Sequence, residues 1–321
     1  MARLHRVAPG IDPGFSRRYA EDGTVHYPGP DGRPASAAER QRIEALVIPP
    51  AWTEVWICRD GDGHIQAVGT DADGRRQYLY HPRWQSRRER DKYERALALA
   101  ETLPRARRRV TRALRGGEIT QELVLAVAFR LLDLTGLRMG SESALRKGRS
   151  RGLTTLQRRH ARVDGAQVTL RFVGKGRIVN HLSLEDAELA AAMELLVAGD
   201  PRTRLLSWRE GRRRRHLFPP MVNAYIAEVT DGAFTAKDFR TLRGTIVAAR
   251  TLAEIGPVRG RRARSKAEVA AVKATSSALG NTPAVARGSY IDPRVFSRYR
   301  RGQLLDTSRS PAAALRDLVL G

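Results

Sequence analysis

Residues 54–80 have the sequence EVWICRDGDGHIQAVGTDADGRRQYLY, which decides the architecture of the first part of the chain. Short β-prone runs at Glu54–Cys58, His64–Val68 and Arg76–Tyr80 alternate with two segments rich in Asp and Gly. Asp-Gly dipeptides between such runs are typical of the tight turns of β-hairpins. The stretch therefore predicts three consecutive antiparallel strands.

Upstream of these strands, the sequence predicts irregular structure followed by one helix. Residues 1–35 are rich in Gly, Pro and Asp, which favours irregular arms and short strands. Ser36 and Glu39 have the spacing of a capping box, which predicts a helix over 36–46. Together with the strands, these segments predict a small β-rich domain over residues 1–84.

The remainder of the chain, residues 85–321, is predicted to be a mainly helical domain. Apolar residues recur at helical spacing in the ranges 89–103, 120–134, 185–197, 219–229 and 236–255. An interruption by β-prone runs predicts a three-stranded antiparallel sheet over 161–163, 167–173 and 178–184, with Lys175 at a hairpin tip. The fold class is therefore α+β.

Capping patterns predict the helix boundaries in this second domain. Thr235-Ala236-Lys237-Asp238 and Ser265-Lys266-Ala267-Glu268 both fit a capping box and predict two helix starts. The second of these helices is expected to end at Gly280, because glycine favours the position after a helix. Two arginine-rich runs, 209–215 and 259–264, are predicted to be solvated basic loops.

Positive charge is concentrated in the second domain. The chain has a formal net charge of +24, from 58 basic and 34 acidic residues. Residues 1–90 hold 14 arginines, no lysine and 12 acidic residues, which leaves 44 basic and 22 acidic residues for 91–321. A folded, strongly basic region indicates a polyanionic partner. Nucleic acid is favoured over a membrane, because no amphipathic basic helix or long apolar run is present. A generic soluble protein from an arginine-rich proteome is the plainer alternative.

The single cysteine, Cys58, excludes an internal disulfide bond. It lies in an apolar strand-like run, where a buried thiol is the expected role. No apolar secretory segment opens the chain, so we expect a cytoplasmic protein.

Tyr290 is the candidate nucleophile of a site that cleaves phosphodiesters. A phenol has an ordinary pKa of about 10 and needs nearby cations, both to ionise and to neutralise a pentacoordinate transition state. Arginine suits this task, because its planar fork binds two phosphate oxygens.

Arg138 follows an apolar helix that ends at Gly136. Arg240 lies one helical turn after Lys237, so both face the same way. These two positions are therefore selected from 52 arginines, most of which are expected on the surface.

Two further side chains complete the candidate catalytic set. Lys175 lies between two glycines, and lysine can donate its proton when its pKa is lowered, whereas arginine cannot. It is the candidate general acid, with solubility at a hairpin tip as the alternative. Asn281 is the candidate amide donor to a phosphate oxygen, with a turn or helix-cap role as the alternative. Tyr299 is the rival phenol, but it falls within a predicted helix, 292–301, that would pack it.

No metal ion or other cofactor is expected. The seven histidines show no close ligand spacing and there is no cysteine cluster, which argues against zinc. The sequence has no cluster of acidic residues of the kind that would suggest a two-metal nuclease. The run Gly174-Lys175-Gly176 lacks the spacing and the Ser or Thr of a P-loop.

Taken in order, these residues and their surroundings resemble the poxvirus-like bacterial type IB DNA topoisomerases. The N-terminal motifs are IPPAW (48–52), VWI (55–57), GHIQA (63–67) and GRRQY (74–78). The C-terminal motifs are LLDLTGLRMG (131–140), GLTTLQRRH (152–160), RFVGKG (171–176), FTAKDFRT (234–241) and LGNTP (279–283), followed by Tyr290. Each motif is short, but the ordered set covers nearly the whole chain.

The resemblance implies a bilobed clamp around duplex DNA, with a small β-rich domain on one side and a helical catalytic domain on the other. By motif position, Arg138, Lys175 and Arg240 match the family's catalytic Arg, Lys and Arg. Tyr290 matches the nucleophile, which forms a 3′-phosphotyrosyl link and frees a 5′-hydroxyl. Strand rotation and rejoining would then relax supercoiled DNA without ATP or a metal ion. Asn281 stands where many relatives carry histidine, which fits a hydrogen-bonding role.

The resemblance also implies DNA contacts from the N-terminal domain. Gln77, Tyr78 and Tyr80 match DNA-facing positions of the family, and strand periodicity places both tyrosines on the face of Arg76. A glutamine can bind an adenine edge, and tyrosine hydroxyls can hold phosphates. Burial of both tyrosines in the core is the alternative. The full set of candidate DNA contacts is Arg75, Arg76, Gln77, Tyr78, Tyr80, Arg88 and Lys237.

Two other functions stay open at this point. A tyrosine recombinase shares the helical catalytic fold and the Arg-Lys-Arg-Tyr chemistry. Recombinases typically have a helical N-terminal domain and a histidine three residues before the second Arg, where this chain has Lys237. A histone-like nucleoid protein would bind DNA without chemistry. Double-stranded DNA is the expected partner, and we expect a bacterial protein that acts as a monomer.

Overall fold

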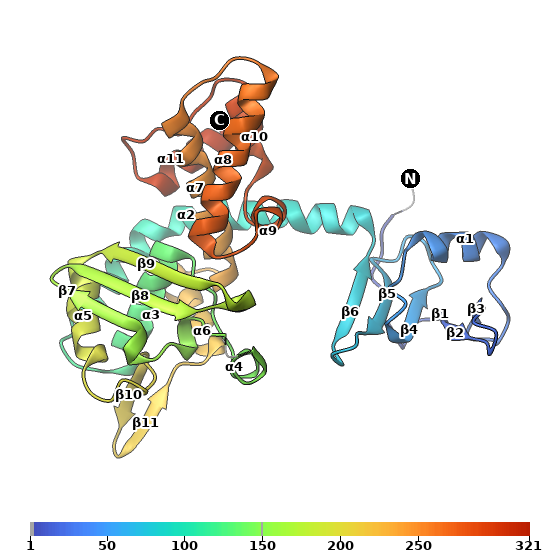
Figure 1. Cartoon of the computed structure of the whole chain (residues 1–321), viewed down its shortest axis with the longest axis horizontal. Helices are drawn as coiled ribbons and strands as arrows, with labels where there is room; N and C mark the ends of the chain where they lie inside the picture. The colour runs from blue at the N-terminus through green and yellow to red at the C-terminus, as the bar shows by residue number, and fades with distance from the viewer. Residues whose placement is uncertain (1–2, 149) are drawn as a thin grey trace. The chain divides into compact units, whose positions relative to one another are not determined.

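The computed structural model describes residues 3–148 and 150–321, and its contacts divide the chain into two compact units, one up to Asp91 and the other from Lys92 onward (Figure 1). Each unit has its own hydrophobic core. Helix α2 (Pro82–Leu114) begins in the first unit and lies mostly in the second. Within the described residues, no helix combines the length and the apolar character needed to cross a membrane.

The first unit is built on a four-stranded antiparallel sheet with the strand order β1-β4-β5-β6. Its elements are β1 (Gly14–Ser16), α1 (Ala37–Ala45), β4 (Thr53–Cys58), β5 (Ile65–Thr70) and β6 (Arg76–Tyr80), with a separate pair of β2 (Arg18–Tyr19) and β3 (Val25–His26). The three predicted strands and the predicted helix are confirmed. The capping box of α1 is present, because Ser36 and Glu39 each accept a hydrogen bond from the other's backbone N–H.

The core of the first unit lies between α1 and one face of this sheet. It contains Phe15, Ile43, Val55, Ile57 and Ala67. Cys58 is also buried, and burial raises the pKa of its thiol. The expectation of a buried thiol is therefore confirmed.

The second unit combines helices with a three-stranded antiparallel sheet in the order β7-β8-β9. The strands are β7 (Ala161–Asp164), β8 (Gln167–Val173) and β9 (Val179–Glu185), which confirms the predicted sheet. The helices are α3 (Gln121–Thr135), α4 (Glu142–Gly148), α5 (Ala187–Val197), α6 (Pro219–Thr230), α7 (Ala236–Ile255), α8 (Arg261–Leu279), α9 (Pro283–Ser289), α10 (Pro293–Arg300) and α11 (Pro311–Leu320), besides most of α2. Single 3-10 turns lie at Leu153–Thr155, Arg158–His160 and Lys175–Arg177.

Helix α3 lies at the centre of the second unit and contacts α5, α6 and α7. Its side chains from Leu123 to Leu132 are buried with one exception, Arg130. Phe129 meets Phe239 of α7 edge-on, with 5.2 Å between the ring centroids. Because α3 is packed on several sides, its C-terminal end is held firmly at Gly136, the left-handed residue that leads to the site described below.

Helix α2 is longer than predicted. The sequence predicts that it ends at Leu103, before Pro104, whereas the structure continues it to Leu114. Pro104 is exposed, while Leu103 and Val110 are buried on the other side of the helix. Burial of this continuous apolar face outweighs the backbone hydrogen bond that the proline removes.

The predicted helix start at Ser265 is wrong, because α8 begins at Arg261 after Gly260. Glu268 does not cap the helix. It is buried and accepts two hydrogen bonds from the Arg300 guanidinium, at 2.7 and 2.9 Å. Ser265 and Glu268 have the spacing of a capping box, but the carboxylate of Glu268 binds the distant Arg300 instead.

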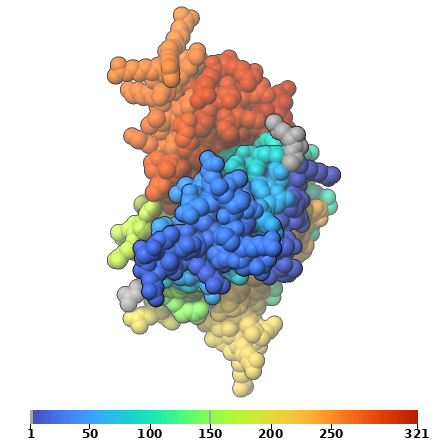
Figure 2. Space-filling model, turned by 90° about the vertical axis from the view of Figure 1, so that its right-hand side faces the viewer, coloured from blue at the N-terminus to red at the C-terminus, as the bar shows by residue number. Residues whose placement is uncertain are grey.

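The two arginine-rich runs are not simply loops. Residues 209–215 form most of a hairpin, in which β10 (Ser207–Glu210) pairs with β11 (Arg213–His216) around Gly211. Residues 259–264 include the first turn of α8. The arginines of both runs are exposed, as predicted, and Figure 2 shows these parts of the second unit, in yellow and orange, projecting from its surface.

Candidate active site

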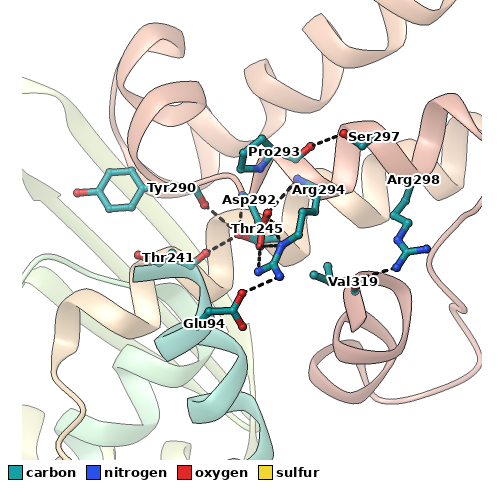
Figure 3. A network of polar contacts seen from close by, with 10 residues as sticks. All are labelled: Glu94, Thr241, Thr245, Tyr290, Asp292, Pro293, Arg294, Ser297, Arg298 and Val319. Atoms are coloured by element: carbon teal, nitrogen blue, oxygen red, sulfur yellow. Dashed lines mark hydrogen bonds and ion pairs between the residues drawn. The ribbon is translucent and has the colours of Figure 1, made fainter. Parts of the chain in front are cut away.

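Tyr290 lies at the C-terminal end of α9, and its backbone is bound to α7. Its N–H donates to the carbonyl of Ala286 at 3.0 Å. Its carbonyl lies 3.2 Å from the hydroxyl of Thr245, which is also 2.8 Å from the carbonyl of Thr241 and accepts from the N–H of Asp292 at 3.2 Å. Figure 3 shows the phenol ring pointing away from this network. The backbone of the residue is therefore held while its reactive end is left free of it.

A glycine in α7 allows Tyr290 to approach the helix closely. A Cβ atom at Gly244 would lie 2.6 Å from the carbonyl oxygen of Tyr290 and 2.9 Å from its Cβ. Both distances are well inside van der Waals contact. A glycine in the middle of a helix is unfavourable by about 0.5–1 kcal/mol relative to alanine, so its presence here has a packing reason.

The segment after Tyr290 is anchored by a buried carboxylate. Asp292 is 2% exposed, caps α10 and binds the guanidinium of Arg294 at 2.7 Å. Arg294 also reaches Glu94 of α2 at 2.7 Å (Figure 3). These ion pairs hold the chain directly after the candidate nucleophile, and both carboxylates are paired within the protein.

Arg240 is buried against Tyr290. Its guanidinium donates to the carbonyl of Gly136 at 2.5 Å and to that of Leu279 at 3.0 Å. The guanidinium carbon lies 4.9 Å from the centroid of the Tyr290 ring. Arg240 thus joins the C-terminal ends of α3 and α8 to the phenol, and its partners are neutral carbonyls that leave its positive charge uncancelled. Lys237, one turn earlier in α7, is exposed.

The electrostatic surroundings favour ionisation of Tyr290. Burial of the ring would raise the pKa of the phenol, but hydrogen bonding and charge from Arg240, with the charges of Arg138 and Lys237, lower it below its ordinary value. Burial also lowers the pKa of Arg240, and the charge of Arg138 adds to this effect. The lowered pKa makes the phenolate, the form that acts as a nucleophile, easier to reach than in a free tyrosine side chain.

A small pocket, which we call the cationic pocket, brings Arg138, Lys175 and Arg240 together. Lys175, on the 3-10 turn between β8 and β9, is exposed, and Arg138, just beyond α3, is half-buried. The lining of the pocket includes Arg138, Arg151, Lys175, Asn180, Arg240 and Gly280. Among the described residues, no carboxylate lines this cationic pocket. Tyr290 is not one of its lining residues, but its ring contacts Arg240, which is.

Asn281 directly follows Gly280 of the cationic pocket. Its backbone is fixed, because its N–H donates to Ser276 at 3.1 Å and its carbonyl accepts from the Ser276 hydroxyl at 2.6 Å. Both polar atoms of its side chain, Nδ2 and Oδ1, are buried and have no hydrogen-bond partner within the described chain. Buried amides without partners are rare in folded proteins, so this one is suited to a ligand oxygen.

Several residues of the site escaped the sequence analysis. Gly244 could have been noticed as a glycine inside a predicted helix. Thr245 and Asn180 carry no local pattern that would distinguish them, because Thr245 contacts Tyr290 and Asn180 contacts Gly280, both far away in the sequence. Asp292 could have been noticed as an Asp before Pro293 at the start of a predicted helix. Tyr299 is buried and donates its hydroxyl to the carbonyl of Gly256 at 2.9 Å, which confirms that the rival phenol is a packed residue.

The candidate DNA contacts of the first unit gather on β6 and the turn before it. We call Arg75, Arg76, Gln77, Tyr78 and Tyr80 the β6 surface. The two tyrosine rings stack with 6.0 Å between centroids, and Tyr78 is 42% exposed, so these rings do not form the core.

Hydrogen bonds and ion pairs hold the polar members of the β6 surface. The Gln77 amide donates to Asp71 at 2.7 Å, and Arg75 pairs with Asp71 at 3.0 Å and with Asp73 at 2.5 Å. Arg88 of α2 lies over the Tyr80 ring, 5.7 Å from its centroid.

Comparison with known proteins gives two family matches and one curated relative. Residues 81–301 match the family described as "Eukaryotic DNA topoisomerase I, catalytic core", and residues 24–71 match "Bacterial DNA topoisomerase IB, N-terminal domain". The chain is similar to the DNA topoisomerase 1B of Acanthamoeba polyphaga mimivirus, with 27% identity over 327 residues that cover 96% of this chain and 97% of the relative. Strand β6 lies between the two matched ranges.

Proposed function

The chain belongs to the type IB DNA topoisomerase family, and we propose that it relaxes supercoiled duplex DNA without ATP or a metal ion, through a covalent link between Tyr290 and the 3′ end of a cleaved strand. The observation that carries this proposal is the position of the Tyr290 phenol, with its lowered pKa, against Arg240. Arg240 in turn lines a pocket that is cationic and free of carboxylates among the described residues.

In the proposed reaction, the phenol loses its proton to solvent water and its oxygen attacks the phosphorus. The bond between Tyr290 and phosphorus forms as the bond from phosphorus to the 5′ oxygen breaks. Lys175 gives its proton to that departing oxygen, which leaves as a 5′-hydroxyl. Rejoining is the reverse transfer, and because one phosphodiester is exchanged for another, no ATP is needed.

Arg138 and Arg240 hold the non-bridging phosphate oxygens and neutralise the charge that builds up on them in the transition state. Asn281 donates an N–H to one of these oxygens, which gives its buried Nδ2 a partner. It has no proton to exchange, so its contribution is smaller than that of either arginine.

The first unit is proposed to contact duplex DNA through the β6 surface and Arg88, and the second unit through Lys237. The stacked, exposed tyrosines and the amide of Gln77 support this assignment. We propose that one chain acts alone on bacterial nucleoid DNA.

The test is a relaxation assay on negatively supercoiled plasmid, with EDTA and without ATP. The protein is expected to produce a ladder of topoisomers, and Tyr290→Phe is expected to bind DNA but to leave the plasmid supercoiled. Tyr299→Phe is the matched control, because it removes a buried phenol that packs away from the site. It should retain relaxation.

Each other outcome points elsewhere. Multimers or resolved products would indicate a recombinase, and unchanged plasmid with the wild-type protein would indicate a passive DNA binder. Loss of activity with EDTA, or a trapped DNA adduct mapped to another residue, would contradict the mechanism.

A further inference from the structure

The turn that carries Lys175 is tightly wound and strained. Gly176 has φ +72° and Arg177 has φ +60°, so two successive residues adopt the left-handed conformation. This conformation is uncommon for a residue other than glycine. The turn therefore needs support from its surroundings to keep Lys175 in one place.

Asn180, the second residue of β9, supplies support from within the hairpin. The carbonyl of Ile178 accepts the N–H of Gly174 at 2.8 Å and also the side-chain amide N–H of Asn180 at 3.1 Å. One carbonyl thus ties both sides of the turn together. The amide of Asn180 faces the cationic pocket, where it is one of the lining residues.

The same amide is wedged between two glycines that are far apart in the sequence. A Cβ atom at Gly174 would overlap its Nδ2, and a Cβ atom at Gly280 would lie 2.6 Å from its Oδ1. Gly174 begins the Lys175 turn, and Gly280 ends α8 immediately before Asn281. The amide of Asn180 therefore fills the narrow space between the Lys175 turn and the segment that bears Asn281.

We propose that Asn180 is a positioning residue that locks the Lys175 turn against the C-terminal end of α8, so that the proton donor is held beside the phosphate that Arg240 and Asn281 bind. This inference rests on the proposed function, because it assumes that Lys175 protonates the departing 5′ oxygen. Asn180 acts through Lys175 and not on the phosphate itself.

The consequence is a defect in one step only. A positioned general acid contributes about 10²–10⁴-fold to a rate. Without Asn180, the turn samples other conformations and Lys175 is in place for only part of the time. Cleavage of ordinary DNA by Asn180→Ala is therefore expected to slow by about 10- to 100-fold, less than for Lys175→Ala, while DNA affinity stays unchanged.

The test uses single-turnover cleavage of a DNA duplex at a site first mapped with the wild-type protein. A second duplex carries sulfur in place of the bridging 5′ oxygen at that site. A thiol has an ordinary pKa of about 8.5, so a thiolate leaves without a proton. On this duplex Lys175→Ala and Asn180→Ala are both expected to return to within a few-fold of wild type. Val179→Ala, an exposed neighbour on the same strand, is the matched control and should cleave both duplexes normally.

A second variant approaches the same contact from the other side. Gly174→Ala would introduce a Cβ whose nearest neighbours are the Asn180 amide and, at 3.6 Å, the carbonyl of Ile178. It should show the same selective defect, and the double variant Gly174→Ala/Asn180→Ala should be no slower than either single variant, because one contact is lost in all three.

The outcomes separate this inference from the proposed function. If Lys175→Ala is not rescued by sulfur, the proposed role of Lys175 fails. If Lys175→Ala is rescued but Asn180→Ala is equally slow on both duplexes, Asn180 acts on the phosphate or on folding and the inference is overturned. Full activity of Asn180→Ala on ordinary DNA would overturn it as well.

Discussion

The cationic pocket and the β6 surface differ in how their side chains are paired. In the pocket, Arg240 is held by two backbone carbonyls, and Arg138 and Lys175 form no ion pair with any described residue. A carbonyl orients a guanidinium without cancelling its charge. The pocket is therefore suited to an anion, and its main cation is held in position by the protein alone.

At the β6 surface the pairing is the opposite. Asp71 and Asp73 neutralise Arg75, and Asp71 also holds the amide of Gln77. A DNA phosphate or base that binds these side chains must replace a carboxylate, so little net affinity is gained. Similar residue types are thus paired differently in the two regions: uncancelled charge suits catalysis, and compensated charge suits discrimination.

The largest expected difference between the two regions is in the effect of losing one arginine. Arg240→Ala should slow cleavage by about 10³–10⁵-fold, the range found when an arginine that stabilises phosphoryl transfer is removed. Arg75→Ala should leave the cleavage rate of bound DNA unchanged and reduce the slope of log affinity against log salt by about one at most. Single-turnover cleavage and binding titrations at several salt concentrations measure both. Equal cleavage defects in the two variants would remove the distinction.

The next prediction concerns whether Tyr290, the candidate nucleophile, is held as firmly as Arg240. Gly244→Ala should push Tyr290 away from α7 and slow cleavage by up to about 10²-fold, since small displacements of reacting groups have effects of this size. Gly288→Ala is the matched control. It lies in α9 two residues before Tyr290, and nothing lies within 4 Å of the position of its Cβ. Cleavage by Gly288→Ala should be normal, and a normal Gly244→Ala would mean that Tyr290 is not held by this contact.

How much of this arrangement could be predicted depends on the range of the interactions. The strands around the Asp-Gly turns and the helix at Ser36 are set by neighbouring residues, and their predictions are confirmed. The helix start at Ser265 is wrong because Glu268 binds Arg300 instead. Local patterns carry no information about such distant partners.

The candidate site shows the same difference between local patterns and distant partners. Arg138, Lys175 and Arg240 were selected from their motifs, and the structure brings them to one pocket. The residues that hold them could not be predicted from local motifs. Thr245 and Tyr290 share a hydrogen bond although they are 45 residues apart, and Asn180 contacts Gly280, which follows α8 in the sequence. The sequence thus indicated the candidate reactive residues, whereas the fold shows which residues hold them in place.

A smaller effect is expected at Asn281, where a substitution should slow cleavage without lowering the stability of the protein. Asn281→Ala should slow cleavage by about 10- to 100-fold, because one hydrogen bond to a charged oxygen is lost, which is less than the loss for Arg240→Ala. The melting temperature should not fall, since the amide of Asn281 has no partner in the free protein. Thermal denaturation of both variants checks this. A destabilised Asn281→Ala would show that the amide supports the fold.

The smallest effect is expected at the β6 surface, and it has the opposite sign. Asp71→Asn removes the charge that compensates Arg75 and weakens the hydrogen bond from Gln77. DNA affinity should therefore rise by about two- to five-fold at low salt, while the cleavage rate of bound DNA is unchanged. Lowering the pH cannot substitute for the mutation, because hydrogen bonds from the Arg75 backbone N–H and other groups lower the pKa of Asp71 to about 2. The rise should also come with weaker preference among cleavage sites, because a freed Gln77 no longer presents its amide in one orientation. Unchanged affinity and site preference would mean that the carboxylates do not compete with DNA, and the contrast between the two regions would then reflect surface packing alone.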